Sequence, residues 1–373
     1  MADALIVAAL RTPIGTAGRG LAAVSAAELG AVVVADVAAE LGTVPAEVIL
    51  GNCMGPGGDV ARVVALLAGL PPAVPALTVD RQCASGLAAI ELGARLVSAG
   101  SGPVVAGGVE SASTAPWRFW PPTDARAPER YERAPFAPAP DDIDMGLAAD
   151  LLAQECGVTR LRQDAYAAES HARAVRAGAR GEFHDEIVPV AGLSADERPR
   201  PGLSAARLAR FPAAFRDGGT VTVGNSCGIN DGAAAVGIVP VPGGAAGPRP
   251  GLRVLGAASV GVAPARPGLG LVPAVERALA QAGLGVRDLD VIEINEAFAG
   301  QVLACCDALG IDPARVCTGG GALALGHPWG ASGAILMVRL FTQLVRQGRG
   351  RYGLAAIAAG GGQGTAVVVE ACR

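Results

Sequence analysis

A short sequence motif that occurs twice constrains the fold of this chain more than any other feature. Gln-Cys-Ala-Ser-Gly at residues 82–86 and Trp-Gly-Ala-Ser-Gly at residues 329–333 each begin an apolar stretch typical of a helix. Each predicted helix leads to an apolar strand, and both strands end in glycines, at residues 104–108 and 355–362. Two copies of a strand, turn, helix and strand indicate a duplicated α/β architecture, with a site where the copies face each other.

The overall composition narrows the class of protein further. The 373 residues, 51% of them hydrophobic, are enough for a large double domain with an ample core. A net charge of −4 at pH 7 argues against a nucleic-acid partner. No apolar run approaches the roughly 20 residues of a membrane span without Gly, Pro or a charge, so we expect no membrane partner. Scattered cysteines and no secretory signal predict a reduced, cytoplasmic protein, and three histidines without ligand-like spacing predict no metal site.

The character of the sequence changes along the chain. From residue 4 to about residue 116, short apolar runs alternate with amphipathic stretches, as in a parallel sheet with helical crossovers. Pro, Arg and acidic residues then become frequent, which predicts an inserted domain or large loop, and afterwards the first pattern returns. We therefore predict an N-terminal half formed by residues 1–116 and 230–251, an inserted domain at 117–229, and a C-terminal half at 252–373.

Three residues at the predicted seam have side chains suited to catalysis. Cys83 lies between a predicted strand and a predicted helix, so its thiol is expected at a helix N-terminus, where the macrodipole favours the nucleophilic thiolate. A buried structural cysteine is the alternative. His327 lies in a turn shaped by glycines and a proline before the second helix, which suggests that it activates Cys83. Asn295 follows a strand and is suited to hold a water or an oxyanion, although a role as helix N-cap would also explain it.

Seven motifs, in the same order along the chain, resemble the thiolases, which are acyl-CoA acyltransferases that make or cleave 3-oxoacyl-CoA. The resemblance covers essentially the whole chain. The motifs lie at residues 11–15, 83–86, 107–111, 163–167, 224–232, 295–299 and 319–333. The resemblance implies a duplicated αβαβα fold of five layers, in which two similar α/β halves carry an inserted loop domain that receives coenzyme A.

The resemblance also implies roles for individual residues. Cys83 looks like the acyl-accepting nucleophile, with His327 as its activator and Asn295 as the holder of a water that helps His327 stabilise a thioester enolate. The backbone N–H groups of Cys83 and Gly360 are similarly placed to form an oxyanion hole. Coenzyme A thioesters would be the substrates, with no permanently bound cofactor. The residues that match coenzyme A-binding segments are Met145, Arg200, Val223, Cys227 and Ile229.

One position departs from the thiolase pattern. Thiolases usually carry a second cysteine, which moves the proton on the α-carbon of the substrate, at the position where this chain has Ala358. A methyl group cannot transfer a proton, so this acid/base position is lost, and water or Cys227 would have to substitute for it. Loss of such a group commonly slows a reaction by about 100- to 10,000-fold.

Three functions therefore stay open. The preferred one is thiolase-type transfer of an acyl group from acyl-CoA through an acyl-Cys83 intermediate. The second passes the acyl group to a different nucleophile, either a malonyl-type thioester that loses carbon dioxide, as in ketosynthases, or an amine, an alcohol or water. The third is a non-catalytic partner of another thiolase-fold subunit, which the presence of Cys83, Asn295 and His327 argues against.

The substrate pocket and the assembly are less constrained. Trp117, Phe119 and Trp120 enter the inserted domain together, and Trp329 adjoins His327. We expect these rings either to line the substrate pocket or to cover the joint between domains. The family suggests a homodimer or homotetramer, with the strand before Cys83 at the interface.

Overall fold

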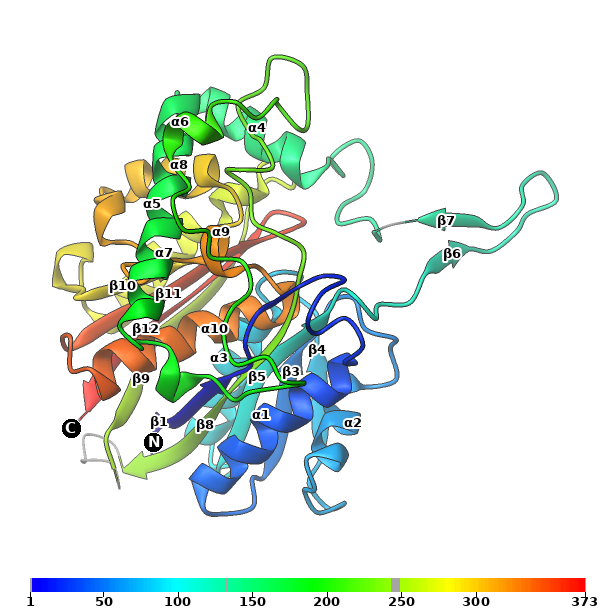
Figure 1. The fold of residues 1–373 in the computed structure, drawn as a ribbon. Coiled ribbons are helices and arrows are strands. Elements are labelled where there is room, and N and C mark those ends of the chain that lie inside the picture. The colour runs from blue at the N-terminus through cyan, green and yellow to red at the C-terminus, as the bar shows by residue number, and fades with distance from the viewer. Residues whose placement is uncertain (1, 132, 243–248, 373) are drawn as a thin grey trace.

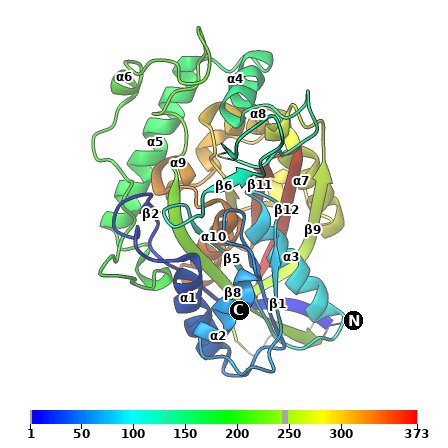
Figure 2. The same cartoon turned by 90° about the vertical axis from the view of Figure 1, so that its right-hand side faces the viewer.

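The computed structural model describes residues 2–131, 133–242 and 249–372, in which one large sheet is layered with helices (Figures 1 and 2). The strands of this sheet lie in the order β10-β11-β12-β9-β1-β8-β5-β3-β4, with β2 paired to β8, and β6 and β7 form a separate hairpin. The strands are β1 (Ala2–Arg11), β2 (Gly15–Thr16), β3 (Glu47–Gly51), β4 (Ala76–Val79), β5 (Val104–Ser111), β6 (Arg118–Trp120), β7 (Glu129–Tyr131), β8 (Asn230–Pro242), β9 (Gly251–Gly261), β10 (Val291–Ile294), β11 (Tyr352–Ala359) and β12 (Gln363–Cys372). The helices are α1 (Ala26–Leu41), α2 (Val60–Leu67), α3 (Ser85–Ser98), α4 (Met145–Glu155), α5 (Arg160–Ala179), α6 (Ala205–Leu208), α7 (Leu271–Ala282), α8 (Ala299–Leu309), α9 (Ala322–Leu325) and α10 (Trp329–Phe341).

The helices form three layers that alternate with two parts of the sheet. α1 and α2 pack on the outer face of the strands from the N-terminal half, and α7 and α8 pack on the outer face of β9 to β12. α3 and α10 lie between the two parts, where α10 contacts β5 and β8 on one side and β10 and β11 on the other. This is the five-layered arrangement that the resemblance to the thiolases implied.

Side chains along the strands alternate between these layers, because successive residues of a strand point to opposite faces. In β5, Val104 and Ala106 belong to the central core around α3 and α10, whereas Val105 and Val109 belong to the outer core under α1. Both faces of the sheet are therefore covered by helices, which explains why the strands read as nearly continuous apolar runs.

The sheet is mixed, so the prediction of a parallel sheet is only partly right. β3 pairs in parallel with β4 and with β5, and β10 pairs in parallel with β11. β8 is antiparallel to β5, because the inserted segment leaves β5 and returns to β8 at the same end of the sheet. The inserted segment consequently lies at the end of the sheet where β4 leads into Cys83.

The inserted segment packs against the C-terminal half. α4 and α5 contact α8, and the buried carboxylate of Glu296 accepts hydrogen bonds from Tyr166 Oη at 2.9 Å and Ser170 Oγ at 2.7 Å. The β6–β7 hairpin extends away from the rest of the molecule (Figure 1). The division of the chain at residues 117, 229 and 252 stays a prediction.

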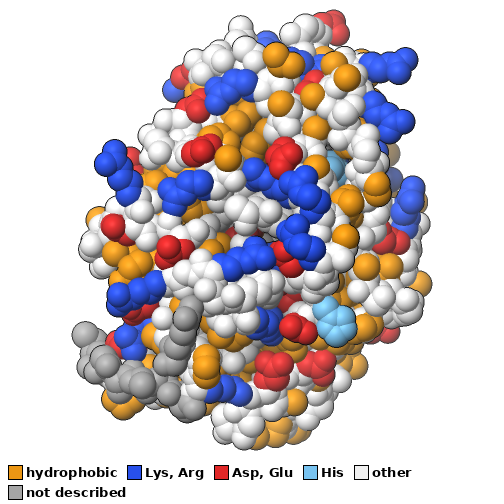
Figure 3. All heavy atoms as spheres, turned by 60° about the vertical axis from the view of Figure 1, so that its left-hand side comes forward, with side chains coloured by type: hydrophobic (Ala, Val, Ile, Leu, Met, Phe, Trp, Pro, Cys, Tyr) orange, Lys and Arg blue, Asp and Glu red, His pale blue; other side chains and the backbone are white. Residues whose placement is uncertain are grey.

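The surface on the side of α5 is mixed in charge. Figure 3 shows arginine and acidic side chains interspersed there, and ion pairs such as Arg162 with Asp307 and Arg176 with Glu169 join them. This face therefore carries no continuous basic stripe. Within the described residues, no helix combines the length and the apolar character needed to cross a membrane.

Candidate active site

α3 and α10 meet at their first turns, and this contact positions the residues that precede them. A Cβ atom on Gly86 would lie 2.7 Å from the carbonyl oxygen of Gly330, and one on Gly333 would lie 2.5 Å from the amide nitrogen of Leu87. Glycine is needed for so close an approach of two backbones. The repeated Ala-Ser-Gly motif is therefore the contact between the two helices. This contact brings the turn before α3, with Cys83, close to the turn before α10, with His327.

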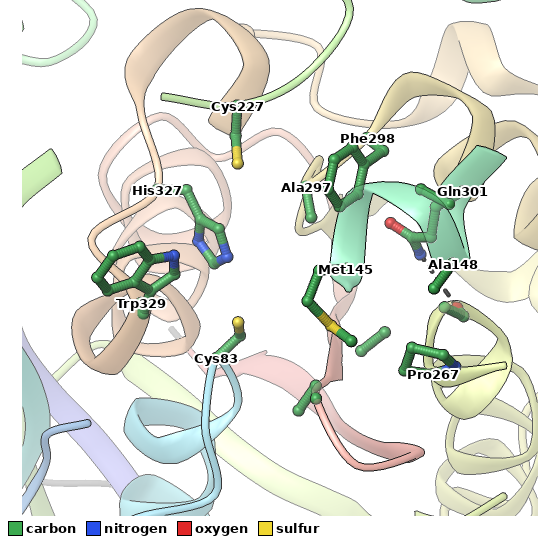
Figure 4. Close-up of a pocket in the computed structure, with 15 residues that line it drawn as sticks. Cys83, Met145, Ala148, Cys227, Pro267, Ala297, Phe298, Gln301, His327 and Trp329 are labelled. Carbon is green, nitrogen blue, oxygen red and sulfur yellow. Dashed lines mark hydrogen bonds between the residues drawn. The ribbon is translucent and has the colours of Figure 1, made fainter. Parts of the chain in front are cut away.

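Cys83 and His327 both line one largely apolar cavity of about 120 Å³. Figure 4 shows the thiol of Cys83 entering from one side, with the imidazole of His327 next to it and Met145 across the cavity. Both halves and the inserted segment contribute to its wall, which is formed by Cys83, Met145, Ala148, Ala149, Cys227, Pro267, Gly268, Ala297, Phe298, Gln301, His327, Trp329, Ala358, Ala359 and Gly360.

The turn that carries Cys83 is tightly held. Gln82 has a φ of 49°, in the left-handed region that residues other than glycine seldom occupy. The hydroxyl of Ser85 accepts a hydrogen bond from Arg81 N at 2.7 Å and donates one to the carbonyl of Gln82 at 2.6 Å. Backbone strain of this kind persists where the surroundings fix it, often at functional sites. The position of the Cys83 thiol is therefore fixed by its own turn.

The resting Cys83 thiol is protonated. Burial, with a smaller contribution from Cys227, raises the pKa of Cys83 to about 12, although the backbone N–H groups of Cys83 and Gly360 oppose the rise. The prediction that the helix N-terminus would favour the thiolate is therefore wrong for the resting group, because desolvation outweighs the stabilisation of the thiolate by the backbone N–H groups. A thiol in this state needs a base when it reacts.

His327 is held in one tautomer. Its Nδ1 lies 2.6 Å from Ser332 Oγ, and that hydroxyl donates its single proton to the carbonyl of Pro328 at 3.1 Å. With the hydroxyl proton directed to Pro328, Nδ1 carries the ring proton and Nε2 has a free lone pair. Burial lowers the pKa of His327 to about 4, so the ring is neutral near pH 7. Nε2 can therefore act as a proton acceptor.

Asn295 lies beside His327 but not on the wall of the main cavity. Its Nδ2 is 3.5 Å from Nε2 of His327, and its side chain lines a smaller neighbouring cavity together with Ser332. It is not a helix N-cap, since α8 begins at Ala299 and Phe298 precedes it. Its role in holding a water or an oxyanion stays a prediction.

The other predicted site residues are only partly brought together. Met145 and Cys227 line the cavity, as does Ala358. Arg200, Val223 and Ile229 are exposed at the surface, and their contact with coenzyme A stays a prediction. No group of His, Cys, Asp or Glu side chains within the described part of the chain is arranged to hold a metal ion.

The aromatic residues divide into two groups. Trp329 lines the cavity, as one of the two expectations had it. Trp117, Phe119 and Trp120 neither line it nor cover a joint between domains, because they are exposed at or in the β6–β7 hairpin, with Trp117 71% exposed. The sequence could not reveal that this segment projects from the body of the protein.

Two residues that position the site were not predicted. Ser332 holds His327, and the signal for it was the repetition of the motif, in which Ser332 corresponds to Ser85. Glu110 accepts hydrogen bonds from Gly330 N at 3.0 Å and Met54 N at 3.1 Å, so it holds the first turn of α10 in place. The signal for Glu110 was a carboxylate near the end of a buried apolar strand, which needs partners.

An apolar cavity that brings a thiol and a neutral imidazole together suits covalent transfer, in which the thiol takes an acyl group and the imidazole takes its proton. At the seam of a duplicated α/β fold, this arrangement defines the class as a cysteine-dependent acyltransferase. Family models described as thiolase, N-terminal domain, and thiolase, C-terminal domain, match residues 4–241 and 248–371. The chain belongs to the thiolase family and is an acyl-CoA acyltransferase.

Individual relatives are similar along their whole length. An acetyl-CoA acetyltransferase from Pseudomonas aeruginosa is 42% identical, with 99% of each chain covered. A beta-ketoadipyl-CoA thiolase from Acinetobacter baylyi is 39% identical over 99% of this chain and 100% of its own. Among solved structures, human mitochondrial 3-ketoacyl-CoA thiolase in complex with CoA has a TM-score of 0.92 at 32% identity, and covers 100% of both chains.

Proposed function

We propose that this protein forms or cleaves 3-oxoacyl-CoA thioesters through an acyl group carried on Cys83. His327 Nε2 takes the thiol proton as the sulfur attacks the carbonyl carbon of the donor. The backbone N–H groups of Cys83 and Gly360 stabilise the resulting oxyanion, and Asn295 assists His327 at the thioester oxygen of the second substrate. The observation that carries this proposal is that Cys83 and the neutral His327, whose Nδ1 is hydrogen-bonded to Ser332, line the same cavity.

The proposed reaction lacks one group that thiolases usually have. Ala358, on β11 beside the oxyanion-hole residue Gly360, stands where the acid/base cysteine is expected, and its methyl group lines the cavity. The proton on the α-carbon must therefore come from another group, and the acyl acceptor is the least constrained part of the reaction.

The test is intact-protein mass spectrometry after mixing with a panel of acyl-CoAs. We expect the mass of one acyl group on the unsubstituted protein and none on a Cys83→Ala variant, because alanine has no nucleophile. Cys156→Ala is the matched control, since Cys156 is exposed at the end of α4 and outside the cavity. An acyl mass that persists in Cys83→Ala would contradict the proposal. An acyl-enzyme that coenzyme A cannot discharge would indicate a different acceptor.

The proposed function also involves a segment that binds coenzyme A, an assembly of subunits and a reducing compartment. The inserted segment 117–229 is the coenzyme A-binding part, which Met145 and Cys227 on the cavity wall support. Two or four copies of the chain assemble, and the partly exposed strand β4, which leads into Cys83, supports an interface there. We place the protein in the cytoplasm, where its free cysteines would stay reduced.

A further inference from the structure

A second thiol faces the cavity across from Cys83. Figure 4 shows the sulfur of Cys227 pointing into the cavity from the side opposite Cys83, with His327 next to both. Cys227 lies in the loop before β8, and its backbone N–H donates to the carbonyl of Ala297 at 2.9 Å. The neighbouring hydroxyl of Ser226 donates to Thr222 O at 2.7 Å. These contacts hold the loop that carries the thiol.

Cleavage of a 3-oxoacyl thioester creates a need for a proton inside this cavity. When Cys83 takes the acyl group, the bond between C2 and C3 breaks and its electron pair stays on C2 as an enolate. Among the described side chains that line the cavity, the ionisable ones are Cys83, His327 and Cys227. Cys83 is then occupied by the acyl group. The enolate carbon C2 is released in the same cavity, whose wall carries Cys227 on the side opposite Cys83.

We propose that Cys227 is the acid that protonates C2 during cleavage and the base that removes this proton during condensation. The inference rests on the proposed function. His327 first takes the proton of Cys83, and the thiolate attacks C3. As the C2–C3 bond breaks, the S–H bond of Cys227 breaks and a C2–H bond forms. The protonated His327 then returns its proton to the Cys227 thiolate, so both groups regain their resting state.

The surroundings of Cys227 fit both of its states. Burial raises the pKa of Cys227 to about 11, and the charge of Arg198 opposes the rise. The thiol is therefore protonated near pH 7, as cleavage requires. Arg198 donates to the carbonyl of Ser226 at 3.0 Å, and a Cβ atom on Gly228 would lie 2.5 Å from its Nη1. A guanidinium thus lies against the turn that carries the thiolate once the proton has been given up.

The experiment compares two half-reactions in a Cys227→Ala variant. Acylation of Cys83 is followed by intact mass, and exchange of the α-protons of acetyl-CoA in deuterated water is followed by the mass of the acetyl group. We expect Cys227→Ala to slow the exchange at least about 100-fold more than it slows acylation, because only exchange needs the second acid/base. Adding Ala358→Cys to this variant should restore exchange, and Cys156→Ala serves as the matched control.

The outcomes separate the two proposals. Exchange in Cys227→Ala within about threefold of the unsubstituted protein would overturn the assignment, because water would then carry the proton. Equal losses of acylation and exchange, in both Cys227→Ala and Cys227→Ser, would also overturn it, because they would place Cys227 in donor binding. If the unsubstituted protein is never acylated, the proposed function itself fails, and this inference fails with it.

Discussion

Ser85 and Ser332 occupy equivalent positions in the two copies of the repeated motif, and each stabilises the turn before its helix. Each lies in the first turn of its helix and holds the turn in front of it: Ser85 through the carbonyl of Gln82, and Ser332 through the carbonyl of Pro328. In the second copy the same hydroxyl also lies 2.6 Å from Nδ1 of His327, and with its own proton on the carbonyl of Pro328 it accepts the proton of Nδ1. A serine that shapes a turn in one half thus selects the tautomer of the base in the other.

We therefore expect Ser332→Ala to slow acylation of Cys83. The lost hydrogen bond contributes about 0.5–1.5 kcal/mol, which corresponds to a rate reduction of up to about tenfold. The measurement is the pre-steady-state rate of acyl-enzyme formation by quenched-flow and intact mass. Ser101→Ala, in the exposed loop after α3, is the control. A Ser332→Ala rate equal to that of the unsubstituted protein would show that the hydroxyl does not hold the imidazole for catalysis.

The pH dependence of acylation reports the same imidazole. Burial lowers the pKa of His327 to about 4, and only the neutral ring accepts the thiol proton. The acylation rate should therefore be constant from about pH 8 down to about pH 5.5 and fall below that, reaching half its plateau near pH 4. A midpoint near the ordinary histidine value of about 6.5 would contradict this account.

A matched variant separates His327 from the other buried imidazole. Burial also lowers the pKa of His171 to about 4, but His171 lies on α5 outside the cavity, where its Nδ1 accepts a hydrogen bond from Arg200 N at 3.2 Å. His171→Asn should leave the midpoint of the acylation profile in place. A shifted midpoint in this variant would assign the titration to the wrong residue.

At the scale of elements, the crossing of α3 and α10 decides whether the site assembles. We expect Gly333→Ala to lower the free energy of unfolding by about 1–3 kcal/mol, because its Cβ would lie 2.5 Å from the backbone nitrogen of Leu87. The measurement is thermal or urea unfolding, together with the acylation rate. Gly178→Ala in α5 is the control, since its Cβ meets nothing closer than Phe183 at 3.9 Å and helix propensity favours alanine by about 0.5–1 kcal/mol. Unchanged stability in Gly333→Ala would refute the tight crossing.

The crossing also shows how far the sequence could lead. The motif is repeated in the amino-acid sequence itself, so the two helices could be predicted from it. The proximity of Cys83 and His327 in the fold could be predicted for the same reason. The antiparallel direction of β8 could not be predicted, because it depends on the end of the sheet at which the chain returns from the inserted segment. The protonation state of Cys83 could not be predicted from the sequence either, because the burial that raises its pKa exists only in the folded protein.

At the scale of the whole molecule, the two edges of the sheet differ. The residues of β10 are buried, and Cys317 N donates to the carbonyl of Ile292 at 2.9 Å along that edge. β4 pairs only with β3 among the described strands, and its side chains are partly exposed, with Leu77 40% exposed. An unpaired edge with an exposed leucine is a surface on which another copy can add a strand. This supports the proposed assembly through β4.

We therefore expect Leu77→Asp to weaken self-association. Each interface would bury two Leu77 side chains that are 40% exposed in the isolated chain. Losing this burial costs about 1–2 kcal/mol in total, which is a roughly 5- to 30-fold weaker association, and the desolvation of two aspartates weakens it further. The measurement is molar mass by light scattering across a dilution series. Val44→Asp is the control, because Val44 is also exposed, at 56%, but lies in the loop before β3 and not on β4. An unchanged mass for Leu77→Asp, or a monomeric unsubstituted protein, would exclude this interface. Because β4 leads directly into the turn of Cys83, dissociation should also slow acylation.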